Sequence, residues 1–134
     1  MLARRIVIKF GVFTALLSQL PLDDMLKTLT SLDIYSVELG TANYPRNAHC
    51  KLSLLEDESG LQKFQDTLAR YNVSISALSC HGDPLHPDPE RAKQNREVNR
   101  NTGLLAEKLG VPVVIDNSRT AQCPIVGIEL LERL

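Results

Sequence analysis

The chain has 134 residues, of which 43% are hydrophobic and 23% charged, and this composition is typical of one small folded domain rather than a disordered segment. The formal net charge of -1 gives no basic field for holding nucleic acid, and no apolar run is long enough to span a membrane. Three widely spaced cysteines without a Cys-x-x-Cys pair favour reduced thiols in the cytoplasm over disulfides or a zinc ribbon.

The first two elements are expected to be a strand and a helix. Residues 6–13 are rich in β-branched and aromatic side chains, which is typical of a short buried strand. Arg4 and Arg5 before an apolar stretch superficially resemble a signal peptide, but Lys9 interrupts the stretch and no small-x-small cleavage site follows. Five apolar residues then recur at helical spacing: Leu22, Met25, Leu26, Leu29 and Leu32.

A second strand is predicted over residues 34–39, closed by Gly40. The polar stretch 41–59 is long for a connection, and long loops in compact domains are often functional. The next amphipathic helix is predicted to stop at Asn72, and it is marked by Leu61, Phe64, Leu68 and Tyr71.

The third predicted strand, residues 73–80, ends abruptly in a cluster of imidazoles, a carboxylate and turn residues over positions 81–87. A buried strand that ends in this way is typical of an active-site rim in α/β proteins. A long helix is then predicted to open at Asp88-Pro89-Glu90 and to stop at Gly110, and a fourth strand to follow over residues 113–116.

This alternation of buried strands and helices predicts right-handed crossovers and a parallel sheet in an α/β fold. Strand starts spaced by about 30 to 40 residues match the βα units of a barrel. They equally match a four-stranded open sheet of flavodoxin type, and the periodicity does not decide between the two. We expect one domain over residues 1–134, with an atypical tail over 117–134 that contains one short helix.

Four phrases together resemble the sugar phosphate isomerase/epimerase family of xylose isomerase-like TIM barrels: Gly11-Val12-Phe13-Thr14, Val37-Glu38-Leu39-Gly40, Tyr44-Pro45-x-Asn47-Ala48-His49-Cys50 and Cys80-His81-Gly82-Asp83-Pro84-Leu85-His86-Pro87. The resemblance covers residues 6–116, and the last two phrases are its most specific part. It implies a partial (β/α)8 TIM barrel of about four βα units with a short C-terminal helix, similar to the N-terminal half of such an enzyme. In the family, a divalent metal (Mg²⁺, Mn²⁺ or Zn²⁺) is held largely by ligands on later strands.

Three residues are expected at the carboxyl ends of strands, which converge on one mouth in a parallel barrel. We interpret Glu38 and His81 as catalytic candidates, with an ion pair or helix cap and a loop hydrogen bond as their structural alternatives. Asp116 would suit a substrate hydroxyl or a hard cation, or would simply form a turn.

Two further histidines are candidate substrate-binding residues. His49 and His86 lie in the two polar loops and could cover the mouth, although solvated loop histidines are an equal alternative. Asp83 before Pro84 is interpreted as a turn residue, and Cys50 and Cys80 as buried, inert thiols.

The chemistry implied is aldose-ketose isomerisation or epimerisation of a sugar or sugar phosphate, in which a proton next to a carbonyl is transferred. One alternative is a non-catalytic half-barrel that binds sugar or forms a homodimer through its open sheet edge. A third, an endonuclease IV-like hydrolase, requires more metal-binding histidines and a basic face than three histidines and a charge of -1 provide.

Overall fold

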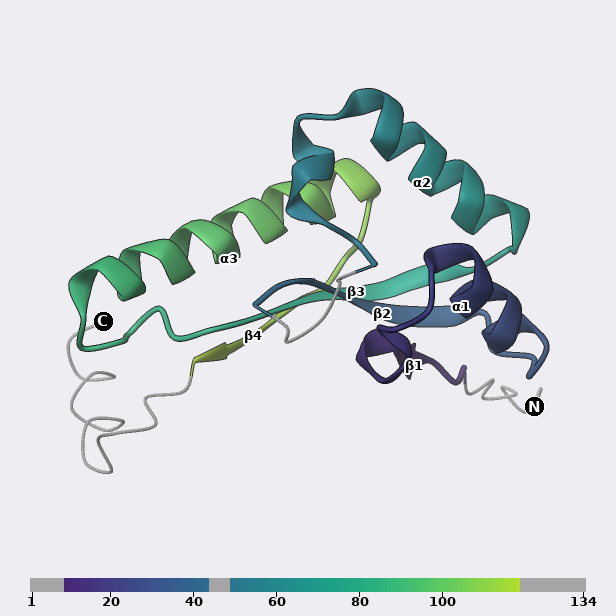
Figure 1. Cartoon of the computed structure of the whole chain (residues 1–134), viewed down its shortest axis with the longest axis horizontal. Coiled ribbons are helices and arrows are strands. Elements are labelled where there is room, and N and C mark those ends of the chain that lie inside the picture. The colour runs from purple at the N-terminus through teal and green to yellow at the C-terminus, as the bar shows by residue number, and fades with distance from the viewer. Residues whose placement is uncertain (1–8, 44–48, 119–134) are drawn as a thin grey trace, which may run out of the picture.

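In the computed structural model, which describes residues 9–43 and 49–118, four parallel strands form one sheet (Figure 1). The spatial order β1-β2-β3-β4 follows the chain order. A flavodoxin-type sheet would instead place the first strand between the second and the third. The predicted α/β class with a parallel sheet is therefore confirmed, and the order differs from the flavodoxin alternative. The strands are β1 (Val12–Phe13), β2 (Ser36–Ala42), β3 (Ser74–Gly82) and β4 (Val114–Ser118).

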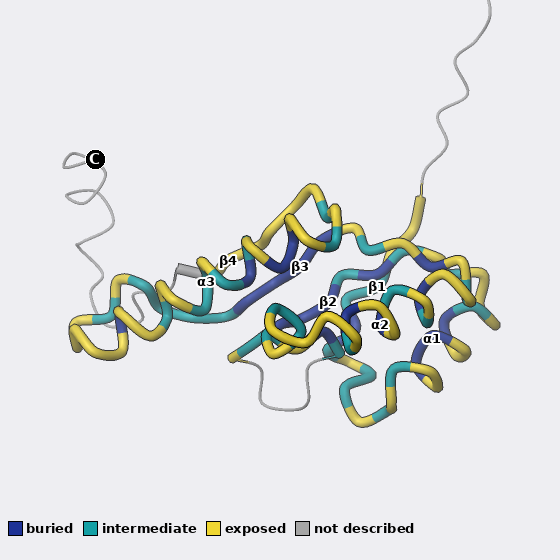
Figure 2. The backbone as a smooth tube through the Cα atoms, turned by 90° about the horizontal axis from the view of Figure 1, so that it is seen from above, coloured by how far each residue is buried: buried dark blue, intermediate teal, exposed yellow. Residues whose placement is uncertain are grey.

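Three α-helices connect these strands and pack on the same face of the sheet (Figure 1). One hydrophobic cluster joins residues of all three helices to Val37 and Leu39 of β2 and to Leu78 of β3. Figure 2 shows this buried layer between the strands and the exposed outer surfaces of the helices. The α-helices are α1 (Leu22–Thr30), α2 (Glu58–Arg70) and α3 (Pro89–Leu109), with short 3-10 helices η1 (Thr14–Leu17) and η2 (Leu52–Leu55).

The helix boundaries follow from capping residues in the sequence. The Asp88 carboxylate accepts hydrogen bonds from the first free backbone N–H groups of α3, and Pro89 occupies the first turn, where its missing N–H costs nothing. Gly110 ends α3 in a left-handed conformation with a φ of 67°. Asn72, the predicted stop after α2, also has a positive φ, of 54°. These predicted ends are confirmed.

Side chains alternate between the two faces of β2. Val37 and Leu39 are fully buried against the helices. Glu38 stands between them and therefore points to the face of the sheet turned away from α1, α2 and α3, hereafter the far face.

Strand lengths differ from the prediction at several ends. Only Val12 and Phe13 join the ladder from the predicted first strand, and residues 1–8 lie outside the described part of the chain. β2 does not close at Gly40 but continues through a bulge to Ala42. Thr41 is buried in this extension, and its hydroxyl donates to the Ser79 carbonyl oxygen of β3, 3.2 Å away, so its polar group has a partner inside the sheet.

The expected tail lies almost entirely outside the described residues, which end at the last residue of β4. Where the structure describes the chain, it contains no helix with the length and apolar character needed to cross a membrane.

Candidate functional site

His81 lies at the carboxyl end of β3, as predicted, and is half-buried. Its ring centroid is 6.5 Å from that of Phe13, with the two rings tilted by 57°. Phe13 belongs to β1, so the contact crosses over β2, which lies between β1 and β3. The two rings therefore form one cluster across three strands.

Glu38 lies on β2, the strand between β1, which carries Phe13, and β3, which carries His81. Its Cα partners in the ladder are Phe13 on β1 and Ala77 on β3. The expectation that Glu38 ends its strand is wrong, because four further residues of β2 follow it. The half-buried Glu38 carboxylate is thus a mid-strand group on the same face of the sheet as Phe13. We group it with His81 because the Phe13 ring contacts His81.

Asp116 belongs to the other face of the sheet. Its carboxylate accepts a hydrogen bond of 2.6 Å from the Nδ2 amide of Asn99 in α3. In the ladder Asp116 pairs with Cys80, one residue before His81. Because successive residues of a strand point to opposite faces, Asp116 and His81 are separated by the sheet. The expected convergence of all three candidates on one mouth is corrected accordingly.

Asn99 is a residue that the sequence reasoning missed. Its Oδ1 atom accepts a hydrogen bond of 3.2 Å from the Cys80 thiol, while its Nδ2 atom holds Asp116. One turn further along α3, the buried Thr102 hydroxyl lies 2.8 Å from that of Thr41. The sheet-facing side of α3 is therefore polar near the strand ends. The available signal was the helical spacing of Asn95, Asn99 and Thr102.

Replacing Asn99 with alanine is expected to lower the free energy of unfolding by about 1–2 kcal/mol, because it leaves Cys80 and Asp116 without their shared partner. The matched control is Asn101→Ala on the same helix, whose side chain lines a surface groove, and we expect a change within about 0.5 kcal/mol. Both changes gain the same helix propensity, so their difference isolates the amide contacts. Urea unfolding followed by circular dichroism measures both, and equal midpoints would contradict the assignment.

Hydrogen bonds connect the loop after β3 to α3. The Asn95 amide donates to the Asp83 carbonyl oxygen at 3.0 Å, and the Asp83 carboxylate accepts from the Leu85 N–H at 3.2 Å. Asp83 is thus the predicted turn residue. Gly82 lies so close to Asn95 that an added Cβ would come within 3.0 Å of its Oδ1 atom. His86 accepts a hydrogen bond at Nδ1 from the Asp88 N–H, at 3.0 Å, so its proton resides on Nε2.

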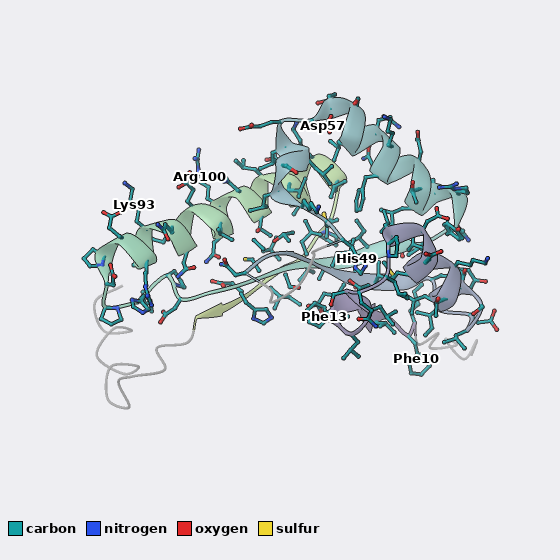
Figure 3. The ribbon with its side chains drawn as sticks, in the orientation of Figure 1. Phe10, Phe13, His49, Asp57, Lys93 and Arg100 are labelled. Carbon is teal, nitrogen blue, oxygen red and sulfur yellow. The ribbon has the colours of Figure 1, made fainter. Side chains whose placement is uncertain are left out.

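His49 is engaged at both ring nitrogens and is half-buried (Figure 3). Nε2 lies 3.0 Å from the Leu20 carbonyl oxygen, which can only accept, so Nε2 carries a proton. Nδ1 lies 3.3 Å from the Thr14 hydroxyl, which also reaches the Glu38 carbonyl oxygen at 3.2 Å. Thr14 therefore links His49 by hydrogen bonds to β2, the strand that carries Glu38. The alternative of a solvated loop histidine is wrong, because both ring nitrogens have protein partners.

The two cysteines in the described residues are buried free thiols, which confirms the burial that was predicted for them. Burial raises the pKa of Cys50 to about 12. Burial also raises the pKa of Cys80, against a smaller lowering contribution from its hydrogen bond to Thr102. A protonated thiol is a poor nucleophile and metal ligand. Cys123 lies outside the described residues.

The free energy of unfolding is expected to fall as pH rises above the ordinary thiol pKa of 9.0, because unfolded Cys50 loses its proton there while folded Cys50 keeps it up to about pH 12. Each pH unit between these two pKa values lowers the free energy of unfolding by up to about 1.4 kcal/mol. Urea titrations between pH 8 and 11 should show a shallower decline for Cys50→Ala than for the wild type. Parallel pH dependences in the two proteins would contradict this expectation.

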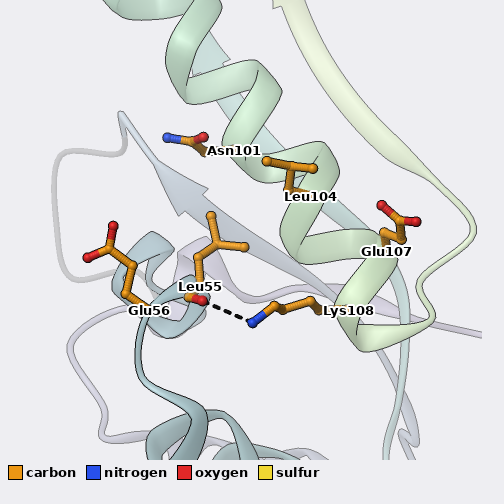
Figure 4. Close-up of a pocket in the computed structure, with 6 residues that line it drawn as sticks. All are labelled: Leu55, Glu56, Asn101, Leu104, Glu107 and Lys108. Carbon is orange, nitrogen blue, oxygen red and sulfur yellow. Dashed lines mark hydrogen bonds between the residues drawn. The ribbon is translucent and has the colours of Figure 1, made fainter.

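Within the described residues, no group of three or more His, Cys, Asp or Glu side chains is arranged to hold a metal ion. A surface groove of about 580 Å³ lies instead between η2 and α3 (Figure 4). There the Lys108 ammonium group donates to the Leu55 carbonyl oxygen at 3.0 Å. The groove is on the helix side of the sheet, so it is separate from the cluster that contains His81.

The fold and the cluster of Phe13, Glu38 and His81 define an α/β protein with a parallel sheet and a candidate polar site on its far face. No model of a known protein family matches the sequence. The chain is 34% identical over 108 residues to YfiH of Bacillus subtilis strain 168, which is described as an uncharacterized protein. The match covers 80% of this chain and 34% of YfiH, so the chain spans about a third of the length of this relative.

Proposed function

We propose that this chain is a half-barrel of the xylose isomerase-like type that acts on a sugar or sugar phosphate by isomerisation or epimerisation. One observation carries the proposal: Phe13, Glu38 and His81 lie on the same far face of a parallel sheet whose strands follow in chain order, and Phe13 is the ladder partner of Glu38 and the ring partner of His81. In a (β/α)8 barrel that order is obligatory, the helices all lie outside, and the opposite face lines the interior.

The reaction would be proton transfer next to a carbonyl group. Glu38 is the proposed base that removes the proton from carbon, since a carboxylate on the far face is available to a substrate lying over β2. His81 is the proposed acid that donates to the carbonyl oxygen, because imidazole gains and loses a proton near neutral pH. Phe13 would offer an apolar surface to the sugar ring and limit the rotation of His81 through their ring contact.

The remaining candidates take different roles in this proposal. His86 would bind a substrate hydroxyl through Nε2, because its Nδ1 is occupied by the Asp88 N–H. His49 would position the Glu38 strand through Thr14 rather than touch substrate. Asp116, held by Asn99 on the helix side of the sheet, would not contact a substrate that lies on the far face.

A divalent metal (Mg²⁺, Mn²⁺ or Zn²⁺) belongs to the family that the sequence resembles, but the described residues do not supply its ligands. We also assign the protein to the cytoplasm as part of the proposal, supported by the free thiols of Cys50 and Cys80.

A non-catalytic half-barrel that binds sugar is the second candidate. It is favoured by the match to only 34% of YfiH, which leaves room in that relative for further strands and their side chains. Binding and turnover must therefore be measured separately.

The test is deuterium incorporation from heavy water into a panel of ketoses, aldoses and their phosphates, followed by NMR. Isomerisation or epimerisation through proton removal predicts deuterium at the carbon next to the carbonyl. Metal-stripped protein and protein supplied with each of the three cations are compared. Saturable sugar binding without exchange under every condition would support the second candidate, and neither binding nor exchange would overturn both.

A further inference from the structure

Exposed apolar side chains flank both edges of the sheet within the described residues. Val113, Val114 and Ile115 at β4 are 47%, 41% and 39% exposed, and they form three consecutive β-branched residues. At the other edge, Phe10 and Leu16 flank β1 and are each 79% exposed. Within the described residues, β1 pairs only with β2 and β4 only with β3. Unpaired apolar edges of this kind are templates for pairing with another strand.

We infer that two copies of this chain close one eight-stranded barrel, with β4 of each copy pairing in parallel with β1 of the other. This inference rests on the half-barrel architecture of the proposed function. A closed barrel of this type needs eight strands, and the described residues supply four in chain order, all parallel and with their helices on one face.

The symmetry follows from the strand directions. A two-fold axis along the barrel keeps all eight strands parallel and brings both kinds of edge together twice, so no edge is left unpaired. An antiparallel pairing of β4 with β4 of a second copy would bury the same three residues but leave both β1 edges open. The exposure of Phe10 and Leu16 beside β1 therefore favours the closed arrangement over the single-edge arrangement.

Closure completes the candidate site. The far face of each sheet, which carries Phe13, Glu38 and His81, would face the same interior from both sides. Each copy would thus provide the wall opposite the other copy's catalytic candidates and exclude water from them. The partner is a second copy of this chain, and the bound state is the active one.

The test measures mass and not activity, so it is independent of whether the protein turns over sugar. Light scattering across a concentration series should give twice the 14.9 kDa mass of the chain. Ile115→Lys and Phe10→Asp should each raise the dimer dissociation constant about tenfold or more, because each places a charge in both seams. Leu32→Lys, at a residue 65% exposed in the turn after α1, is the matched control and should leave the mass unchanged.

Mixing the two edge variants gives the sharpest outcome. A mixed dimer has one seam with both changes and one wild-type seam, so mixing should recover dimers that neither variant forms alone. A monomeric wild type at every concentration would overturn the inference, as would a fully dimeric Phe10→Asp variant, which indicates β4 to β4 pairing. Concentration-dependent protection of the 114–116 amides from hydrogen exchange provides a second readout if a variant folds poorly.

Discussion

Replacing His81 with glutamine is expected to reduce the rate of deuterium exchange into the sugar by a factor of about 10² to 10⁴, the usual contribution of a general acid or base. Glutamine keeps a polar side chain at the end of β3 but cannot gain and lose a proton near neutral pH. The variant should bind sugar nearly as well as the wild type. The measurement is kcat and KM from the exchange time course.

His86→Gln is the matched control for His81→Gln. Its side chain lies in the loop after β3 and accepts a backbone hydrogen bond, so its proposed role is binding. We expect a higher KM with kcat nearly unchanged. Equal losses of kcat in the two variants, or an unchanged kcat in His81→Gln, would contradict the assignment of His81 as the acid.

The largest effect on stability is expected from Leu78→Ala, which should lower the free energy of unfolding by about 2–5 kcal/mol. Leu78 is fully buried in β3 and packs in the cluster that joins the sheet to the helices. Removing three carbon atoms there loses their burial and leaves a cavity. Because small domains are stable by only about 5–15 kcal/mol, this loss is a large share of the total.

Leu85→Ala provides the comparison, because Leu85 is 47% exposed in the loop after β3. Its truncation should cost less than about 1 kcal/mol. Urea unfolding midpoints with a common slope give both values. A Leu78→Ala protein as stable as Leu85→Ala would mean that the sheet and helices do not share one core.

The order and the ends of the helices could be predicted from the sequence because local chemistry determines them. Asp88 and Pro89 start α3, and Gly110 and Asn72 provide left-handed stops. These residues act within one turn of their own position, so no knowledge of the tertiary structure is needed.

The candidate site was harder to predict because it depends on register. Glu38 was expected at a strand end, but a bulge and the hydrogen bond of Thr41 to β3 carry β2 onward to Ala42. Asp116 was expected beside His81, yet the ladder pairs it with Cys80 and places it on the opposite face. A shift of one residue moves a side chain across the sheet, and an apolar run without alternation, such as Val113-Val114-Ile115, does not fix that shift.

We propose that sugars bind on the far face, near the carboxyl ends of these strands. The most direct measurement is a titration of isotopically labelled protein with a sugar phosphate, followed by backbone amide NMR shifts. We predict saturable shifts near residues 13–14, 38–43 and 80–83, and little change near residues 72–74 at the opposite end of the sheet. Shifts confined to that opposite end, or no saturable shifts with any sugar of the panel, would mean that sugars do not bind on the far face.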